Sequence, residues 1–161
     1  MAGLSGTQER LNKSQTMSNI EKAVPFFMVT DITASIDFYV KGLGFEIKNS
    51  WTTGGKMRWC WLEVGDVAIM LQEFLTDGQN PIVSKRQLGE GVEIFFICQD
   101  SLKIYDQIKE RGLSASEPFV GNNMWVVGVR DPDGYKISFE SPTDVTGEIT
   151  YSDWLKDQGH L

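Results

Sequence analysis

One carboxylate in this sequence interrupts a run of apolar residues. Glu93 lies within the otherwise apolar segment 92–97, where a negative charge needs a partner. Such a residue is a candidate ligand anchor or general base, although a glutamate near the start of an edge strand is also compatible with simple exposure to solvent. Glu140, near the end of a second apolar run, is a weaker candidate of the same kind.

The sequence contains few histidine and cysteine residues that could take part in catalysis or metal binding. The only histidine is His160, so a metal site built on two imidazoles is excluded within one chain. Catalysis by a Ser-His-Asp or Cys-His group would depend on this residue near the C-terminus. The two cysteines, Cys60 and Cys98, lie in apolar strand-like runs, which is typical of reduced, buried thiols in a cytosolic protein. Acid–base chemistry near neutral pH is therefore left to carboxylates.

Aromatic residues alternate along the strand expected over residues 56–64. Trp59 and Trp61 share one face of this strand with Glu63, because side chains two residues apart point the same way. Two interpretations stay open: the indoles fill a core, or they form a platform for a ligand. A platform suits a flat or cationic organic molecule, with stacking and cation–π contacts of ~0.5–2 kcal/mol each.

Composition excludes several classes of protein. The chain has 161 residues, 22 acidic and 15 basic, with a net charge of −7, and 41% of its residues are hydrophobic. That hydrophobic fraction is enough for a globular interior. Without a basic stripe to neutralise phosphates, nucleic-acid binding is not expected. No segment approaches the ~18 apolar residues of a membrane span, and no signal peptide is recognisable, so a cytoplasmic protein is predicted.

The elements that position these residues occur twice along the chain. Residues 26–31 (FFMVTD) match residues 95–100 (FFICQD) at a spacing of 69, and Gly65 and Gly134 have the same spacing. In each half, an expected helix lies between a first strand and three further strands. Asp31 or Thr33 can cap the first helix, and Asp100 can cap the second. The expected strands cover residues 24–29, 45–51, 56–64 and 67–73, then 92–98, 113–120, 124–129 and 135–140. The pattern predicts an α+β fold with tandem βαβββ units, each leaving one sheet face free to form a concave pocket.

Module boundaries follow from composition. We expect a flexible N-terminal tail over 1–21, a first module over 22–76, a linker over 77–90, a second module over 91–143 and a C-terminal tail over 144–161. Met17 is a candidate start of the native chain. Tyr151, Trp154 and Leu155 recur at near-helical spacing, so the C-terminal tail either packs on the body or a partner, or frays.

On these motifs the sequence resembles the vicinal oxygen chelate superfamily, which holds glyoxalase I, extradiol dioxygenases, and the fosfomycin- and bleomycin-resistance proteins. The resemblance covers about residues 22–143 and rests on segments from both units: 29–31 (VTD), 38–39 (FY), 43–45 (LGF) and 131–135 (DPDGY) followed by Ile137. It implies the glyoxalase/bleomycin-resistance fold, a concave mixed sheet. It also implies a homodimer whose pockets form between subunits.

The resemblance also identifies where a metal would be held. In metal-dependent members, His or Glu side chains from the first and last strand of each unit bind the ion. The matching positions here are Val24, Met70, Glu93 and Ser138. Only one carboxylate remains in this set, because valine cannot coordinate, methionine suits soft metals and a neutral serine is a weak ligand. We therefore predict that the family's metal site is absent and that no cofactor is needed.

Two functions fit these residues. The first is a bleomycin-resistance-like protein that binds a small hydrophobic or cationic organic molecule in a metal-free aromatic pocket. The alternative is a glyoxalase-related lyase or isomerase that uses Glu93 as general base, with Ser138, Gln72 or Glu140 as a second polar group. The predicted ligand-binding residues are Phe26, Met28, Trp59, Trp61, Met70, Gln72, Glu93, Phe95, Trp125, Ser138 and Glu140.

Overall fold

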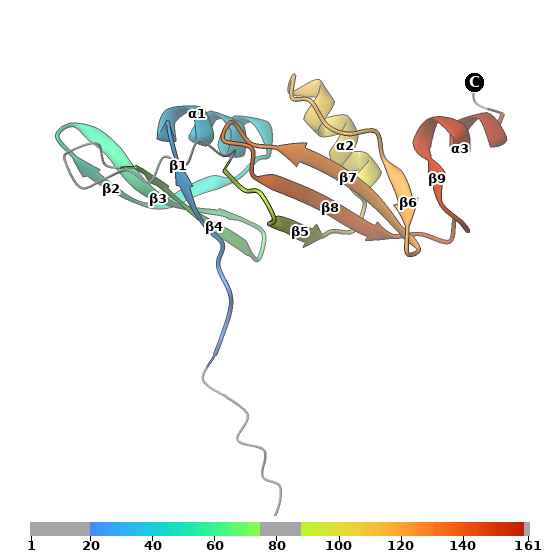
Figure 1. Ribbon diagram of the computed structural model, residues 1–161, viewed down its shortest axis with the longest axis horizontal. Helices are drawn as coiled ribbons and strands as arrows, with labels where there is room; N and C mark the ends of the chain where they lie inside the picture. The colour runs from blue at the N-terminus through green and yellow to red at the C-terminus, as the bar shows by residue number, and fades with distance from the viewer. Residues whose placement is uncertain (1–19, 75–87, 160–161) are drawn as a thin grey trace, which may run out of the picture.

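The computed structural model describes residues 20–74 and 88–159 (Figure 1). Residues 1–19 of the expected N-terminal tail, with Met17, lie outside this part. So do residues 77–87 of the expected linker, and His160.

The first unit forms a four-stranded sheet in the order β1-β4-β3-β2. Strand β1 runs parallel to β4, and the remaining neighbours are antiparallel. Its elements are β1 (Phe26–Val29), α1 (Ile32–Ile36), the π-helical turn η1 (Asp37–Gly42), β2 (Glu46–Thr53), β3 (Lys56–Val64) and β4 (Val67–Glu73).

The second unit repeats this layout and adds one strand and one helix. Its sheet has the order β5-β8-β7-β6-β9, again with the first strand parallel to the last strand of the βαβββ unit. Its elements are β5 (Glu93–Ile97), α2 (Ser101–Glu110), β6 (Phe119–Gly121), β7 (Met124–Arg130), β8 (Lys136–Pro142), β9 (Ile149–Thr150) and α3 (Tyr151–Asp157). Part of the expected C-terminal tail is therefore ordered, since β9 pairs with β6 and α3 follows it.

Aspartates begin the first helix of both units. Asp31 Oδ1 accepts hydrogen bonds from the backbone N–H groups of Thr33 (2.9 Å) and Ala34 (3.3 Å). Asp100 Oδ1 accepts one from Lys103 N at 3.0 Å. These side chains satisfy N–H groups that have no partner within the helix. The cap predicted at Asp100 is confirmed, and of the two candidates for the first helix, Asp31 and Thr33, the structure has Asp31.

The strand register shows that the two sequence repeats also have equivalent structures. Phe26 on β1 lies opposite Met70 on β4, and Phe95 on β5 lies opposite Ser138 on β8. Phe26 and Phe95 are equivalent in the sequence repeat, so Met70 and Ser138 occupy equivalent places in the two sheets. The predicted α+β fold of tandem βαβββ units is confirmed.

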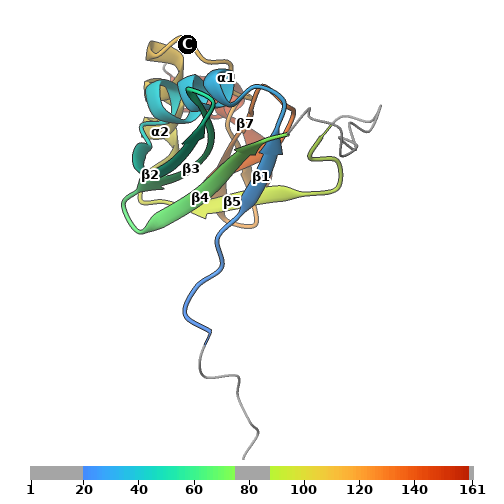
Figure 2. The same cartoon turned by 90° about the vertical axis from the view of Figure 1, so that its left-hand side faces the viewer.

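The helices cover one side of the sheets and leave the other side open. Figure 1 shows α1 and α2 above the strands, and Figure 2 shows the same layering from the end of the molecule. The interior lies between the helices and the sheets and draws on both units, including Phe27, Tyr39, Leu62, Leu71, Ile108 and Ile137. The sheet faces turned away from the helices are therefore not covered by other elements of the described chain.

A turn of the second unit fastens it to the first. The loop 131–135, between β7 and β8, places Asp133 against Thr30, whose backbone N and Oγ1 donate to it at 2.9 and 2.6 Å. Asp131, only 4% exposed, accepts a hydrogen bond of 3.1 Å from the Tyr39 hydroxyl. The Asp-Pro-Asp-Gly sequence is typical of a turn, and its two aspartates also join the units.

Strand β2 forms the outer edge of the first sheet. All eight of its residues are exposed, and its pairing with β3 shifts register twice, between Ile47 and Asn49 and between Trp51 and Thr52. Each shift leaves the strand locally irregular and increases its twist.

Candidate functional site

A cavity of about 300 Å³ lies on the uncovered face of the second sheet. Four of the predicted site residues line it: Glu93, Phe95, Ser138 and Glu140. The Ser138 hydroxyl, 1% exposed, donates a hydrogen bond of 2.6 Å to Glu93 Oε1. The glutamate itself is exposed, and no described residue donates a hydrogen bond to its second carboxylate oxygen. This pair fixes one carboxylate in orientation while leaving it open to a ligand.

Strand alternation explains how these residues meet. Glu93 and Phe95 lie two residues apart on β5, and their partners on β8 are Lys136 and Ser138. Cross-strand partners point to the same face, so all four side chains project away from the helices. The intervening Phe96 points the other way, into the core.

Six of the seven other residues predicted for the pocket lie in the first sheet. Phe26 pairs with Met70, which pairs with Trp61; Met28 pairs with Gln72, which pairs with Trp59. All six therefore lie on one face. That face is the uncovered one, because the intervening residues such as Leu71 and Cys60 are buried beneath the helices. Trp59 and Trp61 are half-buried and do not belong to the core.

One of these indoles already contacts charges of both signs. The Lys22 ammonium lies 5.1 Å from the centre of the Trp61 ring. The Trp61 Nε1–H donates to Glu63 Oε1 at 2.7 Å. A cation over the ring face and a carboxylate at its edge match the charge distribution of an indole. This surface can therefore hold an ammonium group.

Trp125 is not brought to this face. It is 5% exposed and packs on the helix side against Tyr151 and Trp154 of α3, with ring centroids 5.8 and 5.6 Å away. The odd-numbered residues of β7 point inward, whereas Val126 and Gly128 point to the cavity. The tryptophan therefore belongs to the packing of α3.

The structure adds residues that sequence reasoning did not select. They come from β6, β7 and the segments beside them: Ser116, Phe119, Gly121, Asn122, Val126 and Gly128. The strand pattern over residues 113–120 is weak and did not indicate which side chains face the cavity. One signal was available: Gly128 interrupts a strongly apolar strand, and a glycine there marks a place where space or close approach is needed. It lies opposite Ser138, and its N–H donates to Ser116 Oγ at 2.9 Å.

The positions that would hold the family's metal do not fit a divalent ion. The Ser138 hydroxyl donates its hydrogen bond to Glu93, and Met70 lies between Phe26 and Trp61. Within residues 20–74 and 88–159, no three His, Cys, Asp or Glu side chains are grouped as a metal site requires.

Neither cysteine is placed to act as a nucleophile on the open face. Cys60 is fully buried, and burial raises the pKa of its thiol to about 11. Burial likewise raises the pKa of Cys98, whose thiol donates to the Glu140 carbonyl at 3.3 Å. Both remain protonated near neutral pH.

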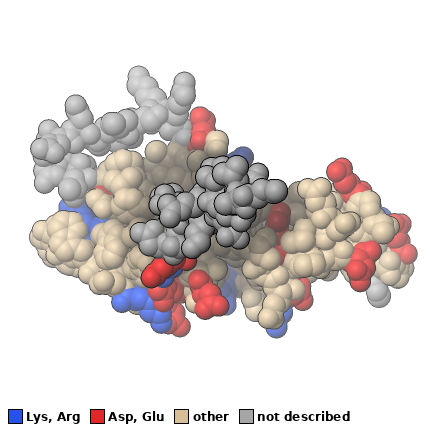
Figure 3. Space-filling model, turned by 90° about the horizontal axis from the view of Figure 1, so that it is seen from below, with Lys and Arg blue, Asp and Glu red and all other residues tan. Residues whose placement is uncertain are grey.

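Figure 3 shows the uncovered face from below. Where grey atoms do not hide it, the surface is largely tan, and charged side chains form small groups on it. In the described part of the chain, no helix is both long and apolar enough to cross a membrane.

Comparisons with known proteins agree with this fold. The sequence profile of the Glyoxalase/Bleomycin resistance protein/Dioxygenase superfamily matches residues 20–139. No curated protein matches the chain in sequence.

Solved structures share the fold at low sequence identity. UcmS2 is 18% identical with a TM-score of 0.62, over 75% of this chain and 98% of its own. TnmS3, an antibiotic binding protein from Streptomyces sp. CB03234, is 20% identical with a TM-score of 0.56, over 76% and 98%. TioX from Micromonospora sp. ML1 is 16% identical with a TM-score of 0.58, over 79% and 100%.

Proposed function

Because the chain belongs to the glyoxalase/bleomycin resistance protein/dioxygenase superfamily, we propose that it binds a small hydrophobic or cationic organic molecule without a metal. The observation that carries this proposal is the Ser138–Glu93 hydrogen bond at the wall of an open cavity. A positioned carboxylate beside aromatic surface attracts a cationic group and leaves stacking to hold the rest of the ligand. The antibiotic-binding relative TnmS3 supports a ligand of drug size.

We propose that a second copy of the chain completes the pocket. The uncovered face exposes large apolar side chains: Phe26 and Phe95 are each 48% exposed, Phe119 is 45% and Ile97 is 67%. Large apolar side chains exposed on one face of a protein are characteristic of an interface or a binding groove. A homodimer would set the aromatic face of one first unit against the carboxylate of its partner's second unit. The reduced thiols of Cys60 and Cys98 support placing this dimer in the cytoplasm.

The ligand proposal is tested with two dyes that share a ring system. Thioflavin T is a flat aromatic cation, and 2-(4-methylaminophenyl)benzothiazole is its uncharged counterpart. We expect Glu93→Gln to weaken thioflavin T binding about tenfold, equivalent to ~1.4 kcal/mol, and to change binding of the neutral dye less than twofold. Fluorescence titration measures both.

Glu90→Gln is the matched control, because Glu90 is exposed just before β5 and does not line the cavity. It should leave both dissociation constants unchanged. Failure of the wild-type protein to bind either dye at micromolar concentration would overturn the proposal, as would equal losses in the two variants.

Dimerisation is tested by light scattering. The wild-type protein should have twice the chain mass of 18.1 kDa at micromolar concentration. Phe95→Lys places a charge on the uncovered face and should give a monomer. Ile47→Lys, at an exposed site on the opposite face of β2, should stay dimeric. A monomeric wild-type protein contradicts the proposal.

The alternative function, a lyase or isomerase, draws on the same hydrogen bond. Ser138 orients a carboxylate that remains exposed, which is what a general base requires. This alternative expects measurable turnover of a glyoxalase-type hemithioacetal in metal-free buffer, lost in Glu93→Gln and kept in Glu90→Gln. A wild-type protein that binds thioflavin T but turns over no such substrate favours binding alone.

A further inference from the structure

The two units meet at two joints that the sequence repeat makes equivalent. At the first joint, the five-residue loop 131–135 packs onto the beginning of α1 and onto η1, and Tyr39 bonds to Asp131. At the second joint, the loop between β3 and β4 has only two residues, Gly65 and Asp66. The counterpart of Tyr39, 69 residues later, is Ile108.

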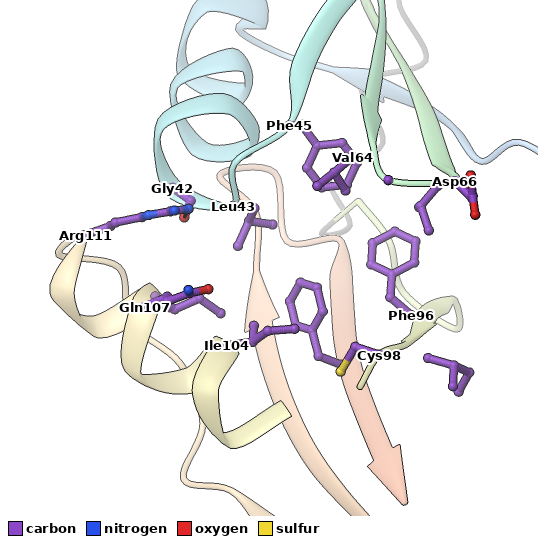
Figure 4. Close-up of a pocket in the computed structure, with 15 residues that line it drawn as sticks. Gly42, Leu43, Phe45, Val64, Asp66, Phe96, Cys98, Ile104, Gln107 and Arg111 are labelled. Carbon is purple, nitrogen blue, oxygen red and sulfur yellow. Dashed lines mark hydrogen bonds between the residues drawn. The ribbon is translucent and has the colours of Figure 1, made fainter. Parts of the chain in front are cut away.

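The two-residue loop and the Ile108 side chain, which is smaller than tyrosine, leave space at the second joint. A cavity of about 450 Å³ lies there, lined by the turn at Gly65 and Asp66, the end of β5, and α2 (Figure 4). At the first joint, the longer loop 131–135 and the Tyr39 side chain occupy the corresponding space. The cavity is therefore a feature built by the sequence difference between the repeats.

This cavity is separate from the site proposed above. Its walls include Phe96 and Phe139, which alternate along β5 and β8 with the Phe95 and Ser138 side chains of the other cavity. The two cavities therefore lie on opposite faces of the second sheet. Phe45, Val64 and Ile104 complete a largely apolar lining.

Among the described residues that line the cavity, the charged ones lie at its two ends. Figure 4 shows Arg111, with Gln107 beside it, at one end and Asp66 at the opposite end. The Arg111 Nη1 donates to the Gly42 carbonyl at 3.1 Å. No carboxylate of residues 20–74 and 88–159 lies within ion-pair distance of this guanidinium. A guanidinium has five N–H donors, so several remain for a ligand.

We propose that this cavity binds an organic monoanion, a molecule with an apolar body and one carboxylate or sulfonate group. The anion pairs with Arg111, and the apolar body lies between Phe45, Phe96 and Ile104. Asp66 at the far end disfavours a second negative group. The volume is within the range of small-ligand pockets, ~300–1,000 Å³.

The test uses two naphthalene probes of matched shape. 8-Anilinonaphthalene-1-sulfonate carries one negative charge, and N-phenyl-1-naphthylamine is the same ring system without it. Arg111→Gln should weaken binding of the sulfonate about tenfold and that of the neutral probe less than twofold. Arg130→Gln is the matched control, since Arg130 also donates to one backbone carbonyl, that of Gly134, and lines neither cavity.

A second pair of variants locates the probe. Val64→Trp should fill the cavity and weaken both probes at least fivefold, because Val64 lies at its rim and is 38% exposed. Val92→Trp changes an exposed valine outside the cavity and should have no effect. Binding unaffected by Val64→Trp, or equal losses of the two probes in Arg111→Gln, would overturn the inference. Thioflavin T binding reports the first site independently and should be unchanged in Arg111→Gln and Val64→Trp.

Discussion

The hydroxyl of Tyr39, in the first unit, donates a hydrogen bond of 3.1 Å to the buried carboxylate of Asp131, in the second. Asp131 Oδ1 also accepts from the backbone N–H groups of Asp133 (3.0 Å) and Tyr135 (2.8 Å). One carboxylate thus shapes its own turn and ties that turn to η1. Tyr39 is fully buried, so this hydrogen bond lies away from solvent.

We expect Tyr39→Phe to lower the free energy of unfolding by about 1–3 kcal/mol. The variant keeps the ring but leaves one oxygen of a buried carboxylate without a donor. Urea denaturation followed by tryptophan fluorescence measures the change. Tyr105→Phe is the control, because the Tyr105 hydroxyl has no hydrogen bond to another described residue. Equal stability of Tyr39→Phe and wild type would show that the bond contributes nothing.

Asp131 should make stability depend on pH between about 4 and 6. Burial raises its pKa from 3.8 to about 6, although hydrogen bonds from Tyr135, Tyr39 and Asp133 act in the opposite direction. The folded protein therefore holds this proton more tightly than the unfolded chain. Stability contributed by the protonated group is fully present below pH 4 and is lost as the pH rises through about 6.

Asp131→Asn removes this titration while keeping an acceptor for the two backbone N–H groups. Its stability relative to wild type should rise by on the order of 2 kcal/mol between pH 4 and pH 7. Denaturation curves at both pH values give the difference. Asp66→Asn, at an exposed turn, should show no such change. A constant difference between Asp131→Asn and wild type would refute the assignment.

The sequence predicted the fold well because its repeat, caps and turns are local signals. The spacing of residues 26–31 and 95–100 indicated two units, and alternation along β4 and β5 grouped Met70 with Gln72 and Glu93 with Phe95. Alternation along β3 put Trp59 and Trp61 on one face but left open which face that is. The face of Trp125 could not be predicted, because both sides of β7 are apolar and α3 covers one of them.

The cavity at the second joint was also beyond sequence reasoning. It depends on how two units pack, whereas each motif describes one unit. The roles of Asp131 and Asp133 across the joint were missed for the same reason: their spacing indicates a turn but not what the turn contacts.

Trp154 should contribute to stability through Trp125. Its ring lies 5.6 Å from that of Trp125 and stacks on Tyr151 at 5.8 Å. Trp154→Ala would uncover the Trp125 indole and should cost about 2–3 kcal/mol of unfolding free energy, with loss of near-UV circular dichroism. Trp51→Ala, at a 48% exposed site on β2, should cost less than about 1 kcal/mol. Similar costs for both variants would contradict the role of α3.

Protein purified without chelator, after exposure to nickel, zinc, manganese and iron, should retain far less than one metal ion per chain. The reason is the donor set at Val24, Met70, Glu93 and Ser138, in which Ser138 is already bonded to Glu93. Plasma emission spectroscopy measures the content. A Glu93→Gln protein is the comparison: stoichiometric metal in wild type that is lost in this variant would restore a metal site at Glu93.

The irregular pairing of β2 also bears on how the protein avoids aggregation. An edge strand with free backbone groups can add a strand from another molecule and begin a fibril. Here the two register shifts interrupt the straight edge that such addition needs, and Glu46 and Lys48, which pair with each other, place charges along it. Self-association through backbone pairing is thereby disfavoured at this edge, so that contact between copies is left to side-chain surfaces.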